Sequence, residues 1–240
     1  MIILDSQPVL SPSVLDMIIQ RDKKYAMDYV LAENYAELQS LELTGFMLQV
    51  CHVIIVMLDW LVDVNLIRFL QTAEMLKPSL SLPETGSAQE HFPHIVFVLN
   101  KAGRRDFLPQ SMQDYSQLLG RLMVKSRLDI GGNICNVWSG IETDFLPGVV
   151  NSDVNLYLLP EVNFWLKHKY PEPKGAFKGC PELEPLVNDL KQQLWTARRQ
   201  SSHSISATVT DEKSWYIYAT RIWECVRKSL LISEYGRVLR

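Results

Sequence analysis

Short apolar runs that end abruptly in a polar residue recur along the chain. Continuous runs of four to six apolar residues are typical of strands buried on both faces, as in a parallel sheet covered by helices. Three clear runs each precede an Asp or Asn, and two weaker runs follow. The clear runs are 1–4, 53–58 and 94–99, and the weaker ones are 133–138 and 154–159.

Apolar residues at helical spacing lie between these runs, over 13–19, 35–49, 64–76 and 109–125. Ser11 and Pro12 have the residue types of a helix entry, with Ser as the cap and Pro at the first helical position. The alternation of strands and helices predicts an α/β fold with a mostly parallel sheet and flanking helices.

The pattern changes after Pro160. Proline-containing segments interrupt the chain at 170–175 and 180–181, before two predicted helices near 181–199 and 211–239. Thr210 or Asp211 is the predicted cap of the long C-terminal helix. Its apolar stripe consists of Trp215, Tyr218, Ala219, Ile222, Val226 and Leu230, widened by Trp223. We expect an α/β core over 1–160 and a C-terminal helical extension over 161–240 that packs on the same domain. A polar loop with little structure is predicted over 79–93.

Composition narrows the class of protein. With 47% apolar and 21% charged residues among 240, the chain is long enough and apolar enough to bury a core. Its formal net charge of -3 speaks against direct nucleic-acid binding, which depends on clustered Lys and Arg. The four cysteines form no C-x-x-C pair, which fits a reducing cytosol or nucleus, and we expect a cytoplasmic protein. No apolar stretch reaches the roughly 20 residues of a membrane span, and we expect no membrane partner.

The polar residues that end the apolar runs are the first candidates for chemistry, because ligands of open parallel sheets bind beyond the carboxyl ends of the strands. They are Asp5, Asp59, Asn100 and Lys101. A carboxylate at a strand end is suited to hold magnesium and phosphate. The alternative is a strand-end Asp that caps the next turn or helix, and the sequence leaves both readings open.

The end of the 94–99 run resembles the Asn-Lys-x-Asp motif with which P-loop GTPases bind guanine. Here the sequence is Asn100-Lys101-Ala102-Gly103, so Gly103 stands where the family has Asp, and Asp106 follows three residues later. The Asp-x-x-Gly switch of that family corresponds to 5–8, with Pro8 in place of Gly. Proline has no backbone N–H to offer a phosphate.

No G-x-x-x-x-G-K-[ST] phosphate loop occurs in the 240 residues. The prediction is therefore an incomplete P-loop G-domain-like fold without its first strand, phosphate loop and first helix. A degenerate nucleotide site would use Asn100, Lys101 and Asp5. We expect no catalytic residue, no metal and no cofactor, except a purine nucleotide if an upstream phosphate loop is supplied.

Long ordered strings across nearly the whole chain carry a second resemblance. They include Cys51-His-Val-Ile-Ile-Val-Met-Leu-Asp-Trp60, together with 2–13, 68–78, 93–101, 154–160, 212–215, 219–223 and 226–229. These strings resemble the family of nonsense-mediated mRNA decay factors numbered nine in the SMG series.

That resemblance implies a G-domain-like subunit that pairs with a second one, the SMG factor numbered eight. The pair is expected to bind and restrain a phosphatidylinositol-3-kinase-related kinase, SMG factor one, which phosphorylates the helicase Upf one. The implied role is that of a non-catalytic regulatory scaffold in mRNA surveillance.

Other functions are less well supported by the sequence. A nucleotide-hydrolysing fragment would need the missing phosphate loop. An RNA-binding module could use Trp215, Tyr216, Tyr218 and Trp223 beside Arg221, Arg227 and Lys228, although their helical spacing favours packing. His91 and His94 are spaced for a metal, but no carboxylate or thiol cluster accompanies them, so ordinary structural roles are favoured.

Overall fold

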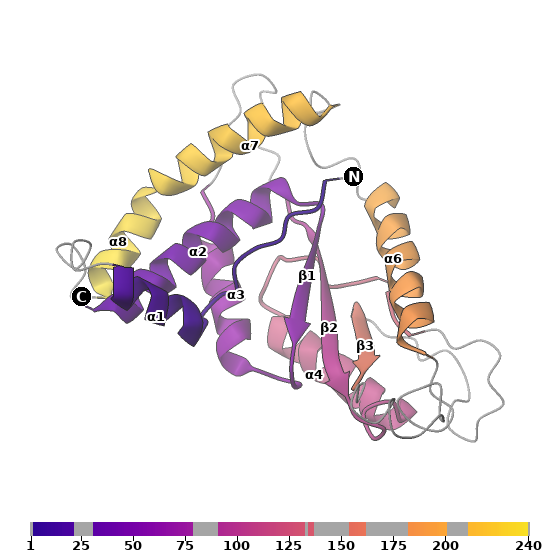
Figure 1. Cartoon of the computed structure of the whole chain (residues 1–240). Coiled ribbons are helices and arrows are strands. Elements are labelled where there is room, and N and C mark those ends of the chain that lie inside the picture. The colour runs from indigo at the N-terminus through magenta and orange to yellow at the C-terminus, as the bar shows by residue number, and fades with distance from the viewer. Residues whose placement is uncertain are drawn as a thin grey trace. The chain divides into compact units, whose positions relative to one another are not determined.

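The computed structural model describes residues 2–21, 31–78, 91–132, 134–136, 154–161, 182–200 and 211–239 (Figure 1). The chain divides into two compact units. The helical unit comprises Met1–Cys51, Arg68–His91 and His203–Arg240, and the sheet unit comprises His52–Ile67 and Phe92–Ser202.

The sheet unit is built on three parallel strands in the order β1-β2-β3. They are β1 (Val53–Leu58), β2 (His94–Ala102) and β3 (Leu156–Pro160). The central strand β2 is the most buried, since residues 95–98 are fully inaccessible to solvent. This burial on both faces explains the unbroken apolar run in the sequence. The predicted α/β class and parallel sheet are confirmed.

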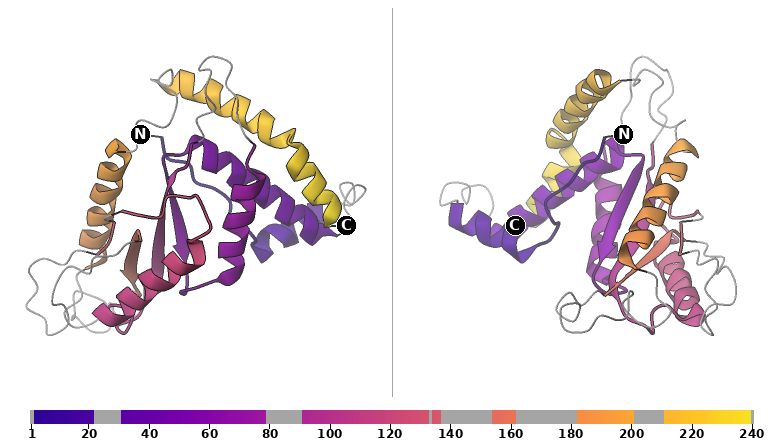
Figure 2. Two further views of the ribbon diagram at one scale, coloured as in Figure 1. Left: turned by 180° about the vertical axis from the view of Figure 1, so that it is seen from behind. Right: turned by 45° about the vertical axis from the view of Figure 1, so that its right-hand side comes forward.

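Two helices of the sheet unit, α4 (Pro109–Met123) and α6 (Leu183–Gln200), lie on opposite faces of the sheet (Figure 2). On the α6 side, Leu190 packs in one buried cluster with Val96, Val98 and Tyr157. The Tyr157 hydroxyl donates to the Leu186 carbonyl at 2.8 Å and to Asp189 Oδ2 at 2.9 Å. These hydrogen bonds attach α6 to β3 and satisfy a hydroxyl group that water cannot reach.

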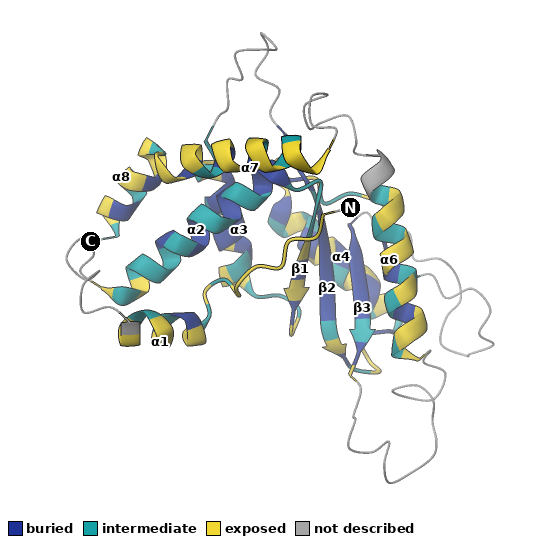
Figure 3. Cartoon of the chain, turned by 45° about the horizontal axis from the view of Figure 1, so that its top comes forward, coloured by how far each residue is buried: buried dark blue, intermediate teal, exposed yellow. Residues whose placement is uncertain are grey.

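The helical unit is organised around α2 (Ala32–Val50), against which α1 (Pro12–Arg21), α7 (Glu212–Arg227) and α8 (Leu230–Val238) pack. Buried residues appear in dark blue in Figure 3, and one buried cluster of this unit contains Leu38, Val50, Ala219, Ile222, Val226 and Ile232. The Tyr235 hydroxyl donates to Glu37 Oε1 at 2.9 Å, and the Tyr218 hydroxyl to the Gln49 carbonyl at 3.3 Å. Helix α3 (Val64–Leu76) begins in the sheet unit and continues in the helical one.

The predicted C-terminal helical segment is confirmed, and it begins as expected at Asp211. The Asp211 side chain accepts from the Ser214 backbone N–H, and the Ser214 side chain accepts from the Asp211 backbone N–H, which makes a capping box. The segment is interrupted at Lys228–Ser229, where the Ser229 hydroxyl caps α8. Because the helical phase restarts there, Ile232 is buried. Leu230, which we predicted in the apolar stripe, is 79% exposed.

The predicted first strand is wrong. Residues 2–8 belong to no helix or strand, and Ile2, Ile3 and Leu4 are all exposed. A strand is stable only when its backbone pairs with a neighbour. The run lies in the helical unit, whose described elements are all helices.

The weak run at 133–138 provides only an isolated bridge from Cys135 to Leu156, and 133, 137 and 138 lie outside the described residues. Residues 79–90 of the predicted polar loop and the proline-containing segments at 170–175 and 180–181 also lie outside them. The boundary at residue 160 between the α/β core and the C-terminal extension stays a prediction.

None of the helices in the described ranges combines the length and the apolar character needed to cross a membrane.

Candidate functional site

Asp59, Asn100 and Lys101 meet at the carboxyl-terminal edge of the sheet. The Lys101 ammonium lies 3.3 Å from Asp59 Oδ1, and Asn100 Oδ1 accepts the Lys101 backbone N–H at 3.0 Å. The ladder between β2 and β3 shifts register between Leu99 and Ala102, and Lys101 has a φ of 56°. A register shift of this kind is typical of a β-bulge, which interrupts the ladder near the end of β2. The convergence of strand ends that the sequence predicted is therefore present for β1 and β2.

The turn after β2 uses its only carboxylate internally. Asp106 Oδ2 accepts the Gly103 backbone N–H at 2.7 Å, and Asp106 Oδ1 accepts the Tyr115 hydroxyl at 2.6 Å. Burial, followed by the hydrogen bond to Asp106, raises the pKa of Tyr115 to about 12. Asp106 thus ties the turn to α4, and both of its oxygens already accept hydrogen bonds.

Asp5, the third residue of the predicted nucleotide site, belongs to the helical unit, whereas Asn100 and Lys101 belong to the sheet unit. Asp5 is exposed and lines a pocket within the helical unit. A nucleotide site that combines Asp5, Asn100 and Lys101 stays a prediction.

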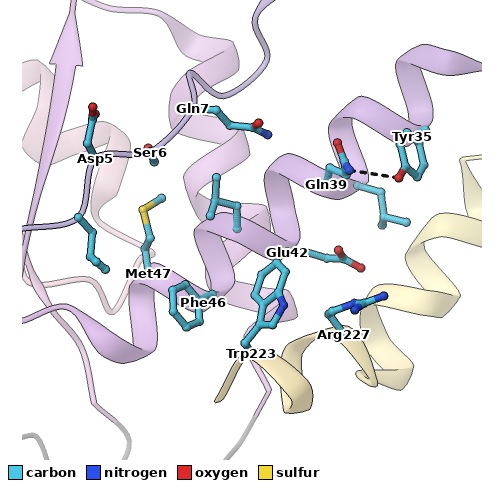
Figure 4. A pocket seen from close by; sticks show the side chains of 13 residues that line it. Asp5, Ser6, Gln7, Tyr35, Gln39, Glu42, Phe46, Met47, Trp223 and Arg227 are labelled. Carbon is cyan, nitrogen blue, oxygen red and sulfur yellow. Dashed lines mark hydrogen bonds between the residues drawn. The ribbon is translucent and has the colours of Figure 1, made fainter. Parts of the chain in front are cut away.

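The pocket of the helical unit is open and has a volume of about 790 Å³ (Figure 4). Its lining comes from three places: residues 4–7, helix α2 and helix α7. Both apolar and polar side chains line it. The lining residues are Leu4, Asp5, Ser6, Gln7, Tyr35, Leu38, Gln39, Glu42, Leu43, Phe46, Met47, Trp223 and Arg227.

The pocket holds one half-buried carboxylate. Burial raises the pKa of Glu42, and the positive charge of Arg227 acts in the opposite direction. Trp223 packs edge-on against Phe46, with ring centroids 5.5 Å apart and an interplanar angle of 82°. Gln39 donates to the Tyr35 hydroxyl at 3.1 Å.

Sequence reasoning missed the Glu42 part of the pocket, because a single Glu in a helix gives no signal of its environment. From the sequence, Trp223 is expected in the apolar stripe of the C-terminal helix and, together with Arg227, in an aromatic and basic group. Of that group, Trp215 and Tyr218 pack against the core of the helical unit, as helical spacing favoured, while Tyr216 is 68% exposed.

The two histidines have separate structural partners. His91 is buried, and its Nε2 lies 2.7 Å from the Cys51 carbonyl oxygen. His94 Nδ1 lies 2.6 Å from Asp129 Oδ2. Within the described ranges, no group of three or more His, Cys, Asp or Glu side chains is arranged to hold a metal ion.

Comparison with known proteins identifies relatives over almost the whole chain. No protein-family model matches it. The chain is 41% identical over 261 residues to the nonsense-mediated mRNA decay factor SMG9 of Xenopus laevis. The aligned region covers 99% of this chain and 50% of the relative. The SMG9 of Salmo salar is 39% identical over 260 residues, with the same shares covered. That of Caenorhabditis elegans is 21% identical over 99% of this chain and 56% of the relative. The chain spans about half the length of the vertebrate relatives, and over 99% of its own length it is similar to proteins named as SMG9 nonsense-mediated mRNA decay factors.

Proposed function

We propose that the chain acts in nonsense-mediated mRNA decay as a non-catalytic regulatory subunit. It pairs with a second G-domain-like subunit, the SMG factor numbered eight, and the pair binds and restrains the phosphatidylinositol-3-kinase-related kinase, SMG factor one. This is a cytoplasmic role. The observation that carries the proposal is the identity of about 40% with SMG9 proteins over 99% of the chain.

The chemistry at the sheet edge supports a role other than hydrolysis. Specific guanine binding in P-loop GTPases needs a free carboxylate after Asn-Lys, and Gly103 has none. The nearby Asp106 carboxylate already accepts hydrogen bonds from Gly103 and Tyr115. Lys101, which would lie against a base, is paired with Asp59. Releasing these groups to a nucleotide would cost the hydrogen bonds that hold the turn.

A purine nucleotide remains a proposed ligand only for a form of the protein that supplies a phosphate loop. A phosphate loop surrounds a triphosphate with successive backbone N–H groups. Such a set of N–H groups is not offered by Asn100, Lys101 and Asp5.

Co-expression tests the proposal. The 240-residue chain is expressed with the counterpart subunit and the kinase, and a tag on the chain is used for purification. We expect all three to purify together, and the kinase to phosphorylate the helicase more slowly in this assembly than alone. The assignment fails if neither protein is retained, or if the kinase rate is unchanged by a chain that is bound.

Phosphate release by the isolated chain provides the opposing measurement. We expect no steady release from GTP or ATP above that of a heat-inactivated sample. Steady release that disappears on Asp5→Ala, and persists in the control Asp16→Ala on α1, would contradict a non-catalytic role.

A further inference from the structure

Residues 2–7 form an exposed segment without regular structure. Each of them is exposed and belongs to no helix or strand, and Figure 3 shows this stretch of the chain before α1 in yellow. No hydrogen bond between residues of the described ranges involves them. The segment can therefore leave its position without breaking a helical or sheet ladder, which makes it one of the parts of the chain that open most readily.

Ser6 is the hydroxyl residue of this segment. Among the Ser and Thr residues that the structure describes, Ser6 alone is exposed and lies outside the helices. The other exposed ones are all held in helices, and they are Ser13, Thr196, Thr220 and Ser233. The environment of Ser6 is therefore different from that of every other described hydroxyl.

Phosphoryl transfer from a protein kinase makes a specific demand on such a hydroxyl. Its oxygen must come in line with the γ-phosphate of ATP inside the kinase active site. An exposed side chain on a segment that can leave its position meets this demand, whereas a side chain in a packed helix does not. Pro8 adds to the suitability of the segment, because a proline disfavours helical backbone at the preceding residue, Gln7.

The chain contains the same Ser-Gln pair in a second, opposite environment. Ser116 is followed by Gln117, as Ser6 is followed by Gln7. Ser116 is only 6% exposed and lies inside α4, so a kinase could reach it only after that helix had opened. The two pairs therefore separate the effect of the fold from the effect of the following residue.

We propose that Ser6 is a phosphorylation site, and that it is modified by the phosphatidylinositol-3-kinase-related kinase of the proposed assembly. The choice of kinase rests on the proposed function. Ser6 Oγ forms a bond to the γ-phosphorus of ATP, the bond from that phosphorus to the bridging oxygen breaks, and ADP leaves, while the hydroxyl proton passes to a base of the kinase. The product carries an added charge of about −1.5 to −2 at pH 7 beside Asp5.

The test uses the full 240-residue chain with the purified kinase and ATP, in the absence of the counterpart subunit. The helicase is the positive-control substrate, and mass spectrometry measures the fraction of each serine that carries phosphate. We expect the modified fraction of Ser6 to exceed that of Ser13 and Ser116 by about tenfold or more, because both of these need a helix to open first.

Variants and a peptide show whether the hydroxyl and its exposure are the cause. Ser6→Thr retains an acceptor hydroxyl and should still be modified at position 6, whereas Ser6→Ala should carry no phosphate there. Ser13→Ala, the matched control on α1, should leave the modified fraction of Ser6 within about twofold of the unmodified chain, since an exposed substitution of this kind has a small effect. In a free peptide of residues 109–123, Ser116 is no longer buried and should become modified.

Three results would overturn the proposal. One is a kinase that phosphorylates the helicase but leaves Ser6 of the intact chain unmodified. Another is an equal modified fraction of Ser6, Ser13 and Ser116, because exposure would then not select the site. The third is a Ser116 that stays unmodified in the free peptide, because its burial in α4 would then not explain its protection.

Co-purification and kinase restraint are measured separately, so the two proposals fail separately. If Ser6 is modified as expected but the kinase is neither retained nor slowed by the chain, the proposed function falls and the phosphorylation site remains. If the proteins co-purify and the kinase is restrained while Ser6 stays unmodified, the phosphorylation site falls and the proposed function stands.

Discussion

Asn155, which lies immediately before β3, is the most sharply testable position of the sheet unit. It is 1% exposed, and its side chain makes three hydrogen bonds to the backbone. Asn155 Oδ1 accepts from the Ile134 N–H at 3.2 Å, and Nδ2 donates to the carbonyls of Ile95 at 3.2 Å and Gly131 at 2.9 Å. The side chain therefore joins β2, β3 and the segment 131–134.

Replacement of Asn155 by Ala removes all three hydrogen bonds, of which those to Ile134 and Ile95 are buried and the one to Gly131 is partly buried. At about 1 kcal/mol for each net hydrogen bond, the loss is about 3 kcal/mol. Against a typical unfolding free energy of about 5–15 kcal/mol, such a loss is large. Urea unfolding followed by far-ultraviolet circular dichroism should show the midpoint lowered by about 1 M or more.

Gly132 provides a second step in the same experiment. Its φ is 151°, and a Cβ at this position would lie 2.3 Å from Asn155 Oδ1. Gly132→Ala should destabilise the unit through both strain and this collision. In the double variant with Asn155→Ala the collision is absent. The double variant should therefore lose less unfolding free energy than the two single variants together, by about 0.5–3 kcal/mol.

The exposed Asn65→Ala on α3 is the control for Asn155→Ala and should change the unfolding free energy by less than about 0.5 kcal/mol. A loss below about 1 kcal/mol for Asn155→Ala, or strict additivity in the double variant, would refute the reasoning about this network.

Three further predictions concern polar groups that are buried or partly buried. Tyr157→Phe removes hydrogen bonds to Leu186 and Asp189 and should lower the unfolding free energy by about 1–2 kcal/mol, measured in urea. The phenol of Tyr115 should titrate near its raised pKa of about 12 in an ultraviolet difference titration against Tyr115→Phe. Its contribution to the free energy of unfolding should be complete below pH 10 and should be lost as the pH rises toward 12. A titration midpoint near 10.0 would contradict the Asp106 contact. Because burial raises the pKa of Glu42 above 4.5, ionisation of its carboxyl opposes folding at neutral pH. Glu42→Gln should therefore raise the thermal unfolding midpoint at about pH 7 and have little effect on it at about pH 4. The same change of the midpoint at both pH values would contradict the assigned burial.

The sequence was sufficient where the apolar pattern and the surroundings agree. Helix α3 spans the predicted residues 64–76, and β1 spans the predicted 53–58, because packing on the core fixes both. Asp211 was one of two predicted caps, since Asp before an amphipathic stretch is a strong local signal.

Long-range structure limited the rest. The apolar residues 2–4 have strand composition, but a strand also needs a neighbour, which no local pattern reveals. The break at Ser229 was hidden because its flanking residues continue the apolar spacing, and only the burial of Ile232 in place of Leu230 shows the new phase. The hydrogen bond from Asn155 to the Ile95 carbonyl joins residues 60 positions apart, so no local sequence pattern predicts it.

The candidate site was predictable in part for the same reason. Parallel strands bring their carboxyl ends to one edge, which is why Asp59 and Lys101 meet as expected. The sequence could not reveal that the Asp106 carboxylate accepts hydrogen bonds from Gly103 and Tyr115, or that Glu42 is half-buried near Arg227. Both features depend on contacts between residues that are not adjacent in the sequence.

The central claim, a regulatory subunit that restrains a kinase, is tested most directly by the rate at which the purified kinase phosphorylates the helicase. The rate is measured with the counterpart subunit present, before and after addition of the 240-residue chain, with the Asn155→Ala and Gly132→Ala double variant as a destabilised comparison. A rate that falls on addition of the intact chain, and falls less with the double variant, is the predicted result. A rate that is the same with and without the intact chain at saturating concentration would contradict the account.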